Sequence, residues 1–357
     1  MNKAQLNGET FLVLWLRDHC QCQECFHSQT KQRLLDTFSI DFEISIISMK
    51  PTKTSTEILF SDNHTFILSH EWLDTQKILF TPKILDPIST PKFLSKEESF
   101  NSSSNPISSI NSTELTPSTI KQFISEIQSK GIKILSPITN PKETCEKISI
   151  IKSTHYGSFW DFTSDLKLND TAYTNLALPL HTDTTYFTDP MKIQMFQLIH
   201  PADDGGASIY SDGFKSAQDL FLKYPHSFSI LSRYCVGGAC GFIKPIHPFP
   251  IFNFIDDVLF QVRWNSCDRA PFFYNLEETE MIYRAMFHFN EILNINMVEI
   301  KLKEDELIGM DNWRILHGRT SFQGYRRMVG CYYGSDDYFA KVRELGLDSC
   351  EVDLLEE

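Results

Sequence analysis

The stretch HTDTTYF, residues 181–187, places a histidine and an aspartate two positions apart, His181 and Asp183. Residues i and i+2 of a β-strand point to the same side, so on a strand these two side chains face one point. An imidazole and a carboxylate on one face supply two ligands for a divalent transition metal. Short His-x-Asp matches also occur by chance, so the interpretation depends on the rest of the chain.

A third ligand is available in DNWRILHGR, residues 311–319, where His317 ends an apolar run and precedes a glycine. Two histidines and one carboxylate form the facial triad of non-heme Fe(II) oxygenases, which leaves coordination positions open for substrate and O2. Because the chain has 11 histidines, the residues alone leave other partners open.

An oxygenase that takes two electrons from 2-oxoglutarate also needs a cation for the far carboxylate of that co-substrate. Arg326 follows His317 in GYRRMVGCYYG, on what should be the next strand, and a guanidinium binds two carboxylate oxygens at once. Ser208, in GGASIYSDG, offers a hydroxyl to the same carboxylate. The alternative for Arg326 is an ordinary surface salt bridge.

Short strand-like runs dominate the chain from about residue 171, and turn residues separate them. These runs are MKIQMFQLIH, ASIYSDG, PIFNFID, VLFQVRW, DELIGMDN and RRMVGCYYG. Only two helical stretches interrupt them, FKSAQDLFLKY and LEETEMIYRAMFHFNEIL. Upstream, the pattern predicts a helix from Pro117 to Gly131, a strand in IKILSPI and a second helix in KETCEKISIIKS. The predicted fold is mainly β with flanking helices, and a jelly roll is favoured over a parallel α/β sheet.

A Ser/Asn/Thr-rich stretch at residues 95–118 is typical of a connector. Before it, TFLVLWL, FEISIIS and STEILF indicate short β-strands. We therefore predict an N-terminal β domain at residues 1–90, a linker at 91–118 and a catalytic domain at 119–357.

Composition narrows the class of protein. The chain of 357 residues is 41% hydrophobic and carries a net charge of −13, which argues against a nucleic-acid partner. No apolar run approaches the roughly 18 to 20 residues of a membrane span. The first residues resemble neither a mitochondrial presequence nor a secretory signal, and nine cysteines form no regular disulfide framework. A cytoplasmic protein is expected, with mitochondria as the alternative.

Three of the cysteines cluster in CQCQEC, namely Cys20, Cys22 and Cys25. Three thiols within six residues are a soft ligand set suited to Zn²⁺, and a histidine would close a tetrahedral site. Such a closed site would be structural and would stabilise a small domain with little core of its own. The alternative is three free thiols.

Several motifs run in the order and spacing of the γ-butyrobetaine hydroxylase and trimethyllysine dioxygenase family. They are YGSFWDFTSD, NDTAYTNLALPLHTDTTYF, GGASIYSDGF, VRWNSCDRA and DNWRILHGRTSFQGYR, and WLRDHCQCQECFHSQTKQRLLDT resembles that family's N-terminal domain. The resemblance covers nearly the whole chain except the linker. It implies a double-stranded β-helix with a small N-terminal zinc-binding β domain, and a homodimer. It also implies Fe(II), 2-oxoglutarate, O2 and ascorbate, used to hydroxylate a C–H bond of a small trimethylammonium substrate.

The resemblance also implies roles for individual residues. His181, Asp183 and His317 would bind iron, while Arg326 and Ser208 would bind 2-oxoglutarate. Zinc would be held by Cys20, Cys22, Cys25 and His64, with His19, His27 and His70 as rivals to His64. An aromatic cage for the quaternary ammonium, whose spread charge favours ring faces, would comprise Tyr156, Trp160, Tyr173 and Tyr332. Each of these four could instead be plain core. Asn265 and Arg269 could hold the substrate carboxylate.

Asp170 is the residue that would determine which of the two substrates is bound. Its carboxylate would attract the α-ammonium of trimethyllysine and repel the carboxylate of γ-butyrobetaine, although LNDT is also typical of a turn. The resemblance therefore implies hydroxylation of trimethyllysine to 3-hydroxy-trimethyllysine, the first step of carnitine biosynthesis. The alternatives are γ-butyrobetaine hydroxylase, which acts in the last step, and a non-catalytic zinc-containing jelly-roll binding module.

Overall fold

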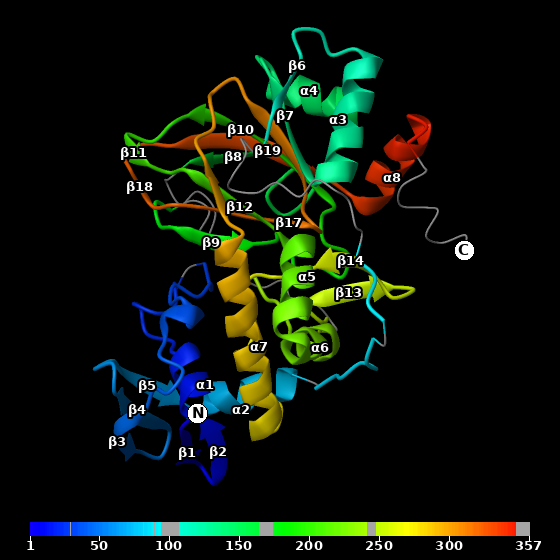
Figure 1. Ribbon diagram of the computed structural model, residues 1–357. Helices are drawn as coiled ribbons and strands as arrows, with labels where there is room; N and C mark the ends of the chain where they lie inside the picture. Colours follow the sequence, from blue (N-terminus) through cyan, green and yellow to red (C-terminus); the bar gives the residue numbers. More distant parts are fainter. Residues whose placement is uncertain are drawn as a thin grey trace.

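Two β-sheets face each other in the upper half of Figure 1 and share a hydrophobic interior. The computed structural model describes residues 1–28, 30–80, 82–88, 90–93, 107–163, 174–240 and 248–347. The larger sheet has six strands in the order β6-β7-β16-β10-β19-β8, and the smaller sheet has four in the order β15-β12-β17-β9. Two facing sheets of mainly antiparallel strands are the arrangement of a jelly roll. The prediction of a mainly β fold with flanking helices is confirmed.

The six strands of the larger sheet come from both halves of the chain. They are β6 (Ser109–Asn111), β7 (Ile132–Ser136), β8 (Phe159–Thr163), β10 (Ile193–His200), β16 (Leu307–Asp311) and β19 (Arg327–Tyr333). Residues 193–198 of β10 are buried without the alternation of a half-exposed strand, because both faces of this sheet are covered. The smaller sheet consists of β9 (Leu178–His181), β12 (Ser208–Asp212), β15 (Val298–Ile300) and β17 (Ile315–Arg319).

Three helices cover the outer face of the larger sheet (Figure 1). They are α3 (Pro117–Lys130), α4 (Pro141–Ile148) and α8 (Ser335–Glu344). The predicted helix from Pro117 is confirmed. The Thr116 hydroxyl accepts from the amide of Thr119 at its start, and Gly131 ends it in the left-handed conformation at φ 79°. A Cβ at Gly131 would also come within 2.6 Å of Ile315 Cδ1 in the smaller sheet. The helix α8 was not predicted.

Three further helices pack between the smaller sheet and the N-terminal part of the chain. They are α5 (Gly213–Lys223), α6 (Pro225–Arg233) and α7 (Leu276–Ile295). α5 and α7 were predicted, and α7 begins with a capping box in which Asn275 and Glu278 satisfy each other's backbone amides. α6 was missed. The long α7 runs from the sheets down beside the N-terminal lobe (Figure 1).

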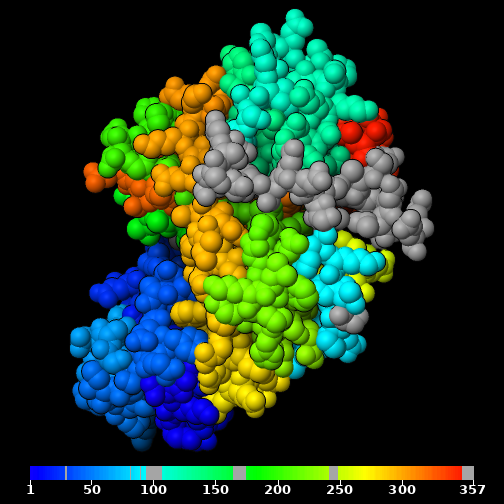
Figure 2. All heavy atoms as spheres, in the orientation of Figure 1, coloured from blue at the N-terminus to red at the C-terminus, as the bar shows by residue number. Residues whose placement is uncertain are grey.

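The N-terminal part forms a lobe of its own against α7 (Figure 2). It contains β1 (Lys3–Leu6), β2 (Glu9–Leu12), α1 (Val13–Asp18), the 3-10 turn Thr37–Ser39, β3 (Ile46–Pro51), β4 (Ser55–Phe60), β5 (Thr65–Ser69) and α2 (His70–Leu79). The prediction that TFLVLWL is one strand is wrong, because the strand ends at Leu12 and the six residues of α1 are all buried. A short apolar run does not distinguish a buried strand from a buried helix.

The predicted linker at residues 91–118 is only partly a connector. Its residues 94–106 lie outside the described residues. The C-terminal end of the predicted linker consists of regular elements, because β6 pairs in parallel with β7 and α3 begins at Pro117.

The remaining strands are two small pairs, β11 (Asp204–Gly205) with β18 (Phe322–Gln323) and β13 (Phe252–Ile255) with β14 (Val258–Val262). In the described part of the chain, no helix is both long enough and apolar enough to cross a membrane.

Candidate metal centre and substrate cavity

Neighbouring strands bring the predicted iron ligands together. His181 is the last residue of β9 and lies directly opposite His317 of β17, so the two imidazole centroids are 4.4 Å apart. Asp183 follows the strand end in a turn that includes Thr184 at φ 57°, so strand alternation does not explain its position. Even so, the Asp183 carboxylate lies 3.3 Å from His181 Nε2 and 3.5 Å from His317 Nε2.

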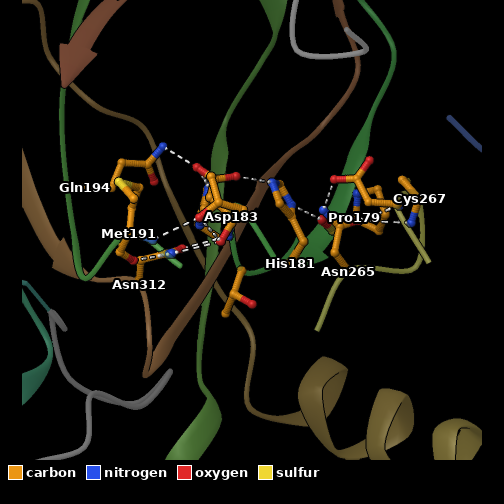
Figure 3. A network of polar contacts seen from close by, with 12 residues as sticks. Pro179, His181, Asp183, Met191, Gln194, Asn265, Cys267 and Asn312 are labelled. Atoms are coloured by element: carbon orange, nitrogen blue, oxygen red, sulfur yellow. Dashed lines mark hydrogen bonds and ion pairs between the residues drawn. The ribbon is translucent and has the colours of Figure 1, made fainter. Parts of the chain in front are cut away.

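Hydrogen bonds with neighbouring residues orient the members of the triad (Figure 3). The Nδ1 of His181 lies 2.8 Å from the Pro179 carbonyl oxygen. When Nδ1 carries the proton, this bond fixes the tautomer that leaves Nε2 free to bind a metal. Asn312 holds the next turn, because its Oδ1 accepts from the Asp183 amide at 2.7 Å while its Nδ2 donates to the Asp183 carbonyl at 3.1 Å.

Two side chains of the larger sheet fix the Asp183 carboxylate. Tyr332 Oη and Gln194 Nε2 both donate to Asp183 Oδ2 at 2.7 Å, and the two donors face each other across the β10–β19 pair. Burial alone would raise the pKa of Asp183, but the His317 and His181 imidazoles hold it well below its usual range. The carboxylate is therefore anionic and rigid. Sequence reasoning placed Tyr332 only in the aromatic cage and missed Gln194 and Asn312, because no sequence signal marks an amide that supports a ligand.

This donor set fits a non-heme Fe(II) centre. Two imidazole nitrogens and one carboxylate oxygen, all within 4.8 Å of one another, can occupy one face of an octahedral ion. A cavity of about 120 Å³ lies beside them and is lined by all three residues. Open coordination positions would therefore point into a space that can hold small ligands.

Arg326 lies in the same cavity and suits a carboxylate ligand. The residue is 6% exposed, and burial lowers the pKa of its guanidinium to about 10, so it stays charged at neutral pH. Among the described residues it forms no ion pair with a carboxylate. Gly206 gives it room, since a Cβ there would lie 3.3 Å from the Arg326 side chain. Ser208 of β12 lines the cavity as well. An unpaired buried guanidinium is costly, so the site fits an anion such as 2-oxoglutarate.

Aromatic side chains line another part of the cavity. Tyr156, Trp160 and Tyr332, three of the residues predicted to form the cage, line the cavity together with Phe162 and Tyr186. The Trp160 ring stacks on Phe162 at 4.3 Å between centroids and 12° between planes. The Tyr156 and Tyr186 hydroxyls lie 3.3 Å apart. The cavity wall is thus rich in aromatic side chains, the residue type that attracts a quaternary ammonium.

The structure separates the two residues predicted to hold the substrate carboxylate. Asn265 lines the cavity, whereas Arg269 does not and instead pairs with Asp18 at 2.7 Å. The predicted Asp170 and Tyr173 lie outside the described residues. Two lining residues that sequence reasoning missed are Asp268 and Gln32, and Gln32 comes from the N-terminal part of the chain.

The cysteine cluster forms a second candidate metal centre. His64 Nε2 lies 3.3 Å from Cys20 Sγ, 3.5 Å from Cys22 Sγ and 3.6 Å from Cys25 Sγ. Around a tetrahedral Zn²⁺, with Zn–S of about 2.3 Å and Zn–N of about 2.0 Å, sulfur and nitrogen ligands lie about 3.5 Å apart. The four residues therefore match a closed zinc site. Arg17 supports it by donating to Cys25 Sγ at 3.3 Å and pairing with Asp62 at 2.8 Å.

The three rival histidines are engaged elsewhere. The Nδ1 of His19 lies 2.8 Å from the Trp15 carbonyl, and His27 Nδ1 accepts from the Thr30 amide at 3.1 Å. The Nε2 of His70 lies 2.9 Å from the Thr56 hydroxyl. Among the described residues, His64 is the histidine that the fold brings to the three thiols.

Comparison with known proteins places the chain in a family. Residues 111–332 match the family model described as taurine catabolism dioxygenase TauD, TfdA family, and residues 7–74 match the model described as gamma-butyrobetaine hydroxylase-like, N-terminal. The chain is 34% identical to the trimethyllysine dioxygenase of Meyerozyma guilliermondii, over 94% of this chain and 90% of that protein. It is 32% identical to the mitochondrial trimethyllysine dioxygenase of Homo sapiens, over 95% and 83%. It is 25% identical to the gamma-butyrobetaine dioxygenase of Homo sapiens, over 93% and 90%. The chain therefore belongs to the TauD/TfdA family of dioxygenases, in the group that contains the trimethyllysine dioxygenases.

Proposed function

We propose that this protein is a trimethyllysine dioxygenase, which hydroxylates N6,N6,N6-trimethyllysine to 3-hydroxy-trimethyllysine in the first step of carnitine biosynthesis. The observation that carries the proposal is the joint presence of the His181, Asp183 and His317 triad and of Arg326 in one cavity. The relatives named trimethyllysine dioxygenase match over nearly the whole chain, and the gamma-butyrobetaine dioxygenase is more distant.

His181, Asp183 and His317 would hold Fe(II). With 2-oxoglutarate and O2, the bound iron supplies the oxidation that replaces one C–H bond by C–OH while 2-oxoglutarate loses CO2 and becomes succinate. The contribution of the protein is to position the metal ligands. Tyr332 and Gln194 both donate to the Asp183 carboxylate and so orient it toward the two histidines.

Arg326 would anchor the far carboxylate of 2-oxoglutarate, with Ser208 beside it. The guanidinium supplies two parallel donors, and its burial strengthens the interaction because little water competes. Ascorbate, which the family resemblance implies, would keep the iron reduced between turnovers.

The aromatic residues would bind the trimethylammonium group. Tyr156, Trp160 and Tyr332 line the cavity, and Tyr173 is proposed as a fourth member. Asp170 is proposed to select trimethyllysine over γ-butyrobetaine, with Asn265 near the amino-acid end of the substrate.

The N-terminal part is proposed to be a structural zinc domain that occupies residues 1–90, with Cys20, Cys22, Cys25 and His64 as ligands. The tetrahedral spacing of these four residues supports the proposal. The catalytic domain is proposed to follow the linker, at residues 119–357. A homodimer and a cytoplasmic location stay predictions; the human relative is named as mitochondrial.

Mass spectrometry of the purified enzyme with both candidate substrates tests the proposal. The mixture contains Fe(II), 2-oxoglutarate and ascorbate, and either trimethyllysine or γ-butyrobetaine. We expect trimethyllysine to gain one oxygen atom at the carbon next to Cα. Preferential hydroxylation of γ-butyrobetaine would contradict the assignment. An anaerobic titration that gives no metal-to-ligand absorption band with Fe(II) and 2-oxoglutarate would favour a non-catalytic binding module.

A further inference from the structure

A short segment of the N-terminal lobe, residues 32–35, is bonded on one side to the proposed zinc centre. Phe26 and Arg33 face each other in an antiparallel bridge. The Leu34 amide donates to the carbonyl of Cys25 at 2.8 Å. Because Cys25 is one of the proposed zinc ligands, coordination of its thiolate also fixes the backbone that holds Arg33.

On its other side, the same segment is bonded to the turn at residues 265–268. The Arg33 amide donates to the Cys267 carbonyl at 3.1 Å, and Arg33 Nη1 donates to the Ser266 carbonyl at 2.6 Å. A longer bond of 3.4 Å joins Nη1 to the Arg269 carbonyl. Arg33 is 7% exposed, so little water competes for these carbonyl groups. One arginine therefore holds the backbone of the turn at three carbonyl oxygens.

The Arg33 guanidinium is itself fixed by the first helix of the lobe. Its Nε donates to the Asp18 carbonyl at 3.1 Å and lies 3.5 Å from Asp18 Oδ1. Burial lowers the pKa of Arg33, and the Asp18 carboxylate opposes that shift. The planar guanidinium thus presents its donors to the turn in one orientation.

The turn forms part of the wall of the substrate cavity. Asn265 and Cys267 line the cavity, and Asn265 Oδ1 accepts from the Cys267 amide at 3.0 Å. Just before the turn, the Trp264 carbonyl accepts from the Thr182 amide at 2.7 Å. The turn therefore lies beside His181, and Figure 3 shows Asn265 and Cys267 near that histidine. Displacement of the turn would move Asn265, which is proposed to lie near the amino-acid end of the substrate.

The residues proposed to bind 2-oxoglutarate have no such support from the lobe. Ser208 lies on β12, between β15 and β17, and Arg326 lies between β18 and β19. Within the described part of the chain, none of the hydrogen bonds of Arg33 reaches either residue. Loss of the Arg33 contacts should therefore affect the substrate and spare the co-substrate.

We propose that Arg33 is a positioning residue for substrate binding and that the zinc centre acts through it. With zinc bound, the Cys25 backbone holds Arg33, and Arg33 holds the 265–268 turn against the cavity. The inference rests on the proposed function and deepens it. Zinc then controls the affinity for trimethyllysine and leaves the affinity for 2-oxoglutarate unchanged.

The test combines a substitution with zinc depletion, both in the full chain. Arg33→Lys keeps a positive charge beside Asp18 and loses the planar set of donors. The matched control is Arg284→Lys on α7, whose side chain is 52% exposed and pairs with Glu280 at 3.1 Å. Each protein is prepared with zinc and without it, and stoichiometric Zn²⁺ is then returned to the depleted samples. Elemental analysis, far-UV circular dichroism and Tm establish the zinc content and the fold of every sample.

Two anaerobic titrations measure the two affinities separately. Calorimetry with Fe(II) and 2-oxoglutarate present gives Kd for trimethyllysine, and the metal-to-ligand absorption band with Fe(II) gives Kd for 2-oxoglutarate. For Arg33→Lys we expect Kd for trimethyllysine to rise about 10- to 100-fold and Kd for 2-oxoglutarate to change less than about threefold. In turnover, KM for trimethyllysine should rise more than kcat falls. Arg284→Lys should match the wild type.

Zinc depletion of the wild type should produce the same selective loss, and returned Zn²⁺ should reverse it. Depletion of Arg33→Lys should add little further loss, because both changes act through the same contacts. Arg33→Lys retains the zinc ligands, so it tests the positioning role even where the zinc-depleted chain is unfolded.

An unchanged Kd for trimethyllysine in Arg33→Lys would overturn the inference and leave the proposed function intact. An equal rise in both Kd values together with a lower Tm would also overturn it, in favour of a purely structural role. A folded, zinc-depleted wild type that binds trimethyllysine normally would exclude control by zinc. Failure of the zinc-loaded wild type to bind or hydroxylate trimethyllysine would overturn both the inference and the proposed function.

Discussion

Arg269 Nη2 donates a hydrogen bond of 2.7 Å to Asp18 Oδ2. This bond joins the turn beside the substrate cavity to α1 of the N-terminal lobe, and the two residues are 251 positions apart in the sequence. The Asp18 carboxylate is fully buried and also accepts from the Tyr283 and Thr37 hydroxyls, both at 2.6 Å. Burial opposes its ionisation, but Arg269 and Arg33 hold its pKa far below the usual range. The two parts of the chain are thus joined through a buried, fully bonded carboxylate.

Asp18→Asn should therefore destabilise the whole molecule. The change leaves two buried guanidinium groups without their counter-charge, and the expected loss is about 3 to 5 kcal/mol of unfolding free energy. Denaturant unfolding measures it. The control is Glu57→Gln, which removes an exposed ion pair with Lys50 and should cost less than about 1 kcal/mol. Equal stabilities for the two variants would mean that the Asp18 contacts contribute little.

Tyr332→Phe should weaken iron binding while the ring stays in the cavity. It removes the hydroxyl that donates to Asp183 at 2.7 Å. Loss of such a supporting bond costs about 10- to 100-fold in metal affinity or activity. Tyr333→Phe is the matched control, because that hydroxyl donates to the Cys145 carbonyl on the other face of the sheet. An anaerobic Fe(II) titration that gives the same affinity for both variants would refute the supporting role of Tyr332.

The N-terminal lobe should contain about one Zn per chain. Cys22→Ser should lower the zinc content and Tm before iron binding is affected, because the two proposed centres use separate ligands. Elemental analysis of the variant provides the measurement, with Cys235→Ser as a control outside both centres. A zinc content that Cys22→Ser leaves unchanged would exclude the proposed ligand set.

Asp170→Asn should lower kcat/KM for trimethyllysine roughly 10- to 150-fold and leave the affinity for 2-oxoglutarate almost unchanged. The same change removes a repulsion, so turnover of γ-butyrobetaine should rise. Steady-state kinetics with both substrates, alongside Tm, supply the comparison. A similar fall for both substrates with a lower Tm would assign Asp170 to a turn instead.

The sequence predicts the ligands better than the contacts that support them. The His-x-Asp pair and the distal His317 are recognisable because metal chemistry restricts residue type and spacing. Strand alternation, however, was the wrong reason for expecting Asp183 beside His181, because Asp183 lies in a turn held by Asn312. Gln194 and Asn312 could not be predicted, since side-chain amides at such positions acquire their supporting roles only from tertiary pairing.

For the fold, too, local signals in the sequence predict some elements and miss others. Thr116, Pro117 and Gly131 mark the ends of α3 locally, so that helix was predictable. The buried α1 was not, because its apolar residues have no helical periodicity to distinguish them from a strand. The contact of Gln32 with Asp268 depends on packing between segments 236 residues apart, which no local pattern encodes.

Trimethyllysine-dependent formation of succinate is the measurement that tests the central claim most directly. Enzyme loaded anaerobically with Fe(II), 2-oxoglutarate and trimethyllysine should form succinate and 3-hydroxy-trimethyllysine in equal amounts when O2 is admitted. His181→Ala, Asp183→Ala and His317→Ala should each form neither, while far-UV circular dichroism and zinc content stay at wild-type values. Near-normal coupled turnover in any of the three variants, or succinate formation by the wild type that trimethyllysine does not stimulate, would contradict the account.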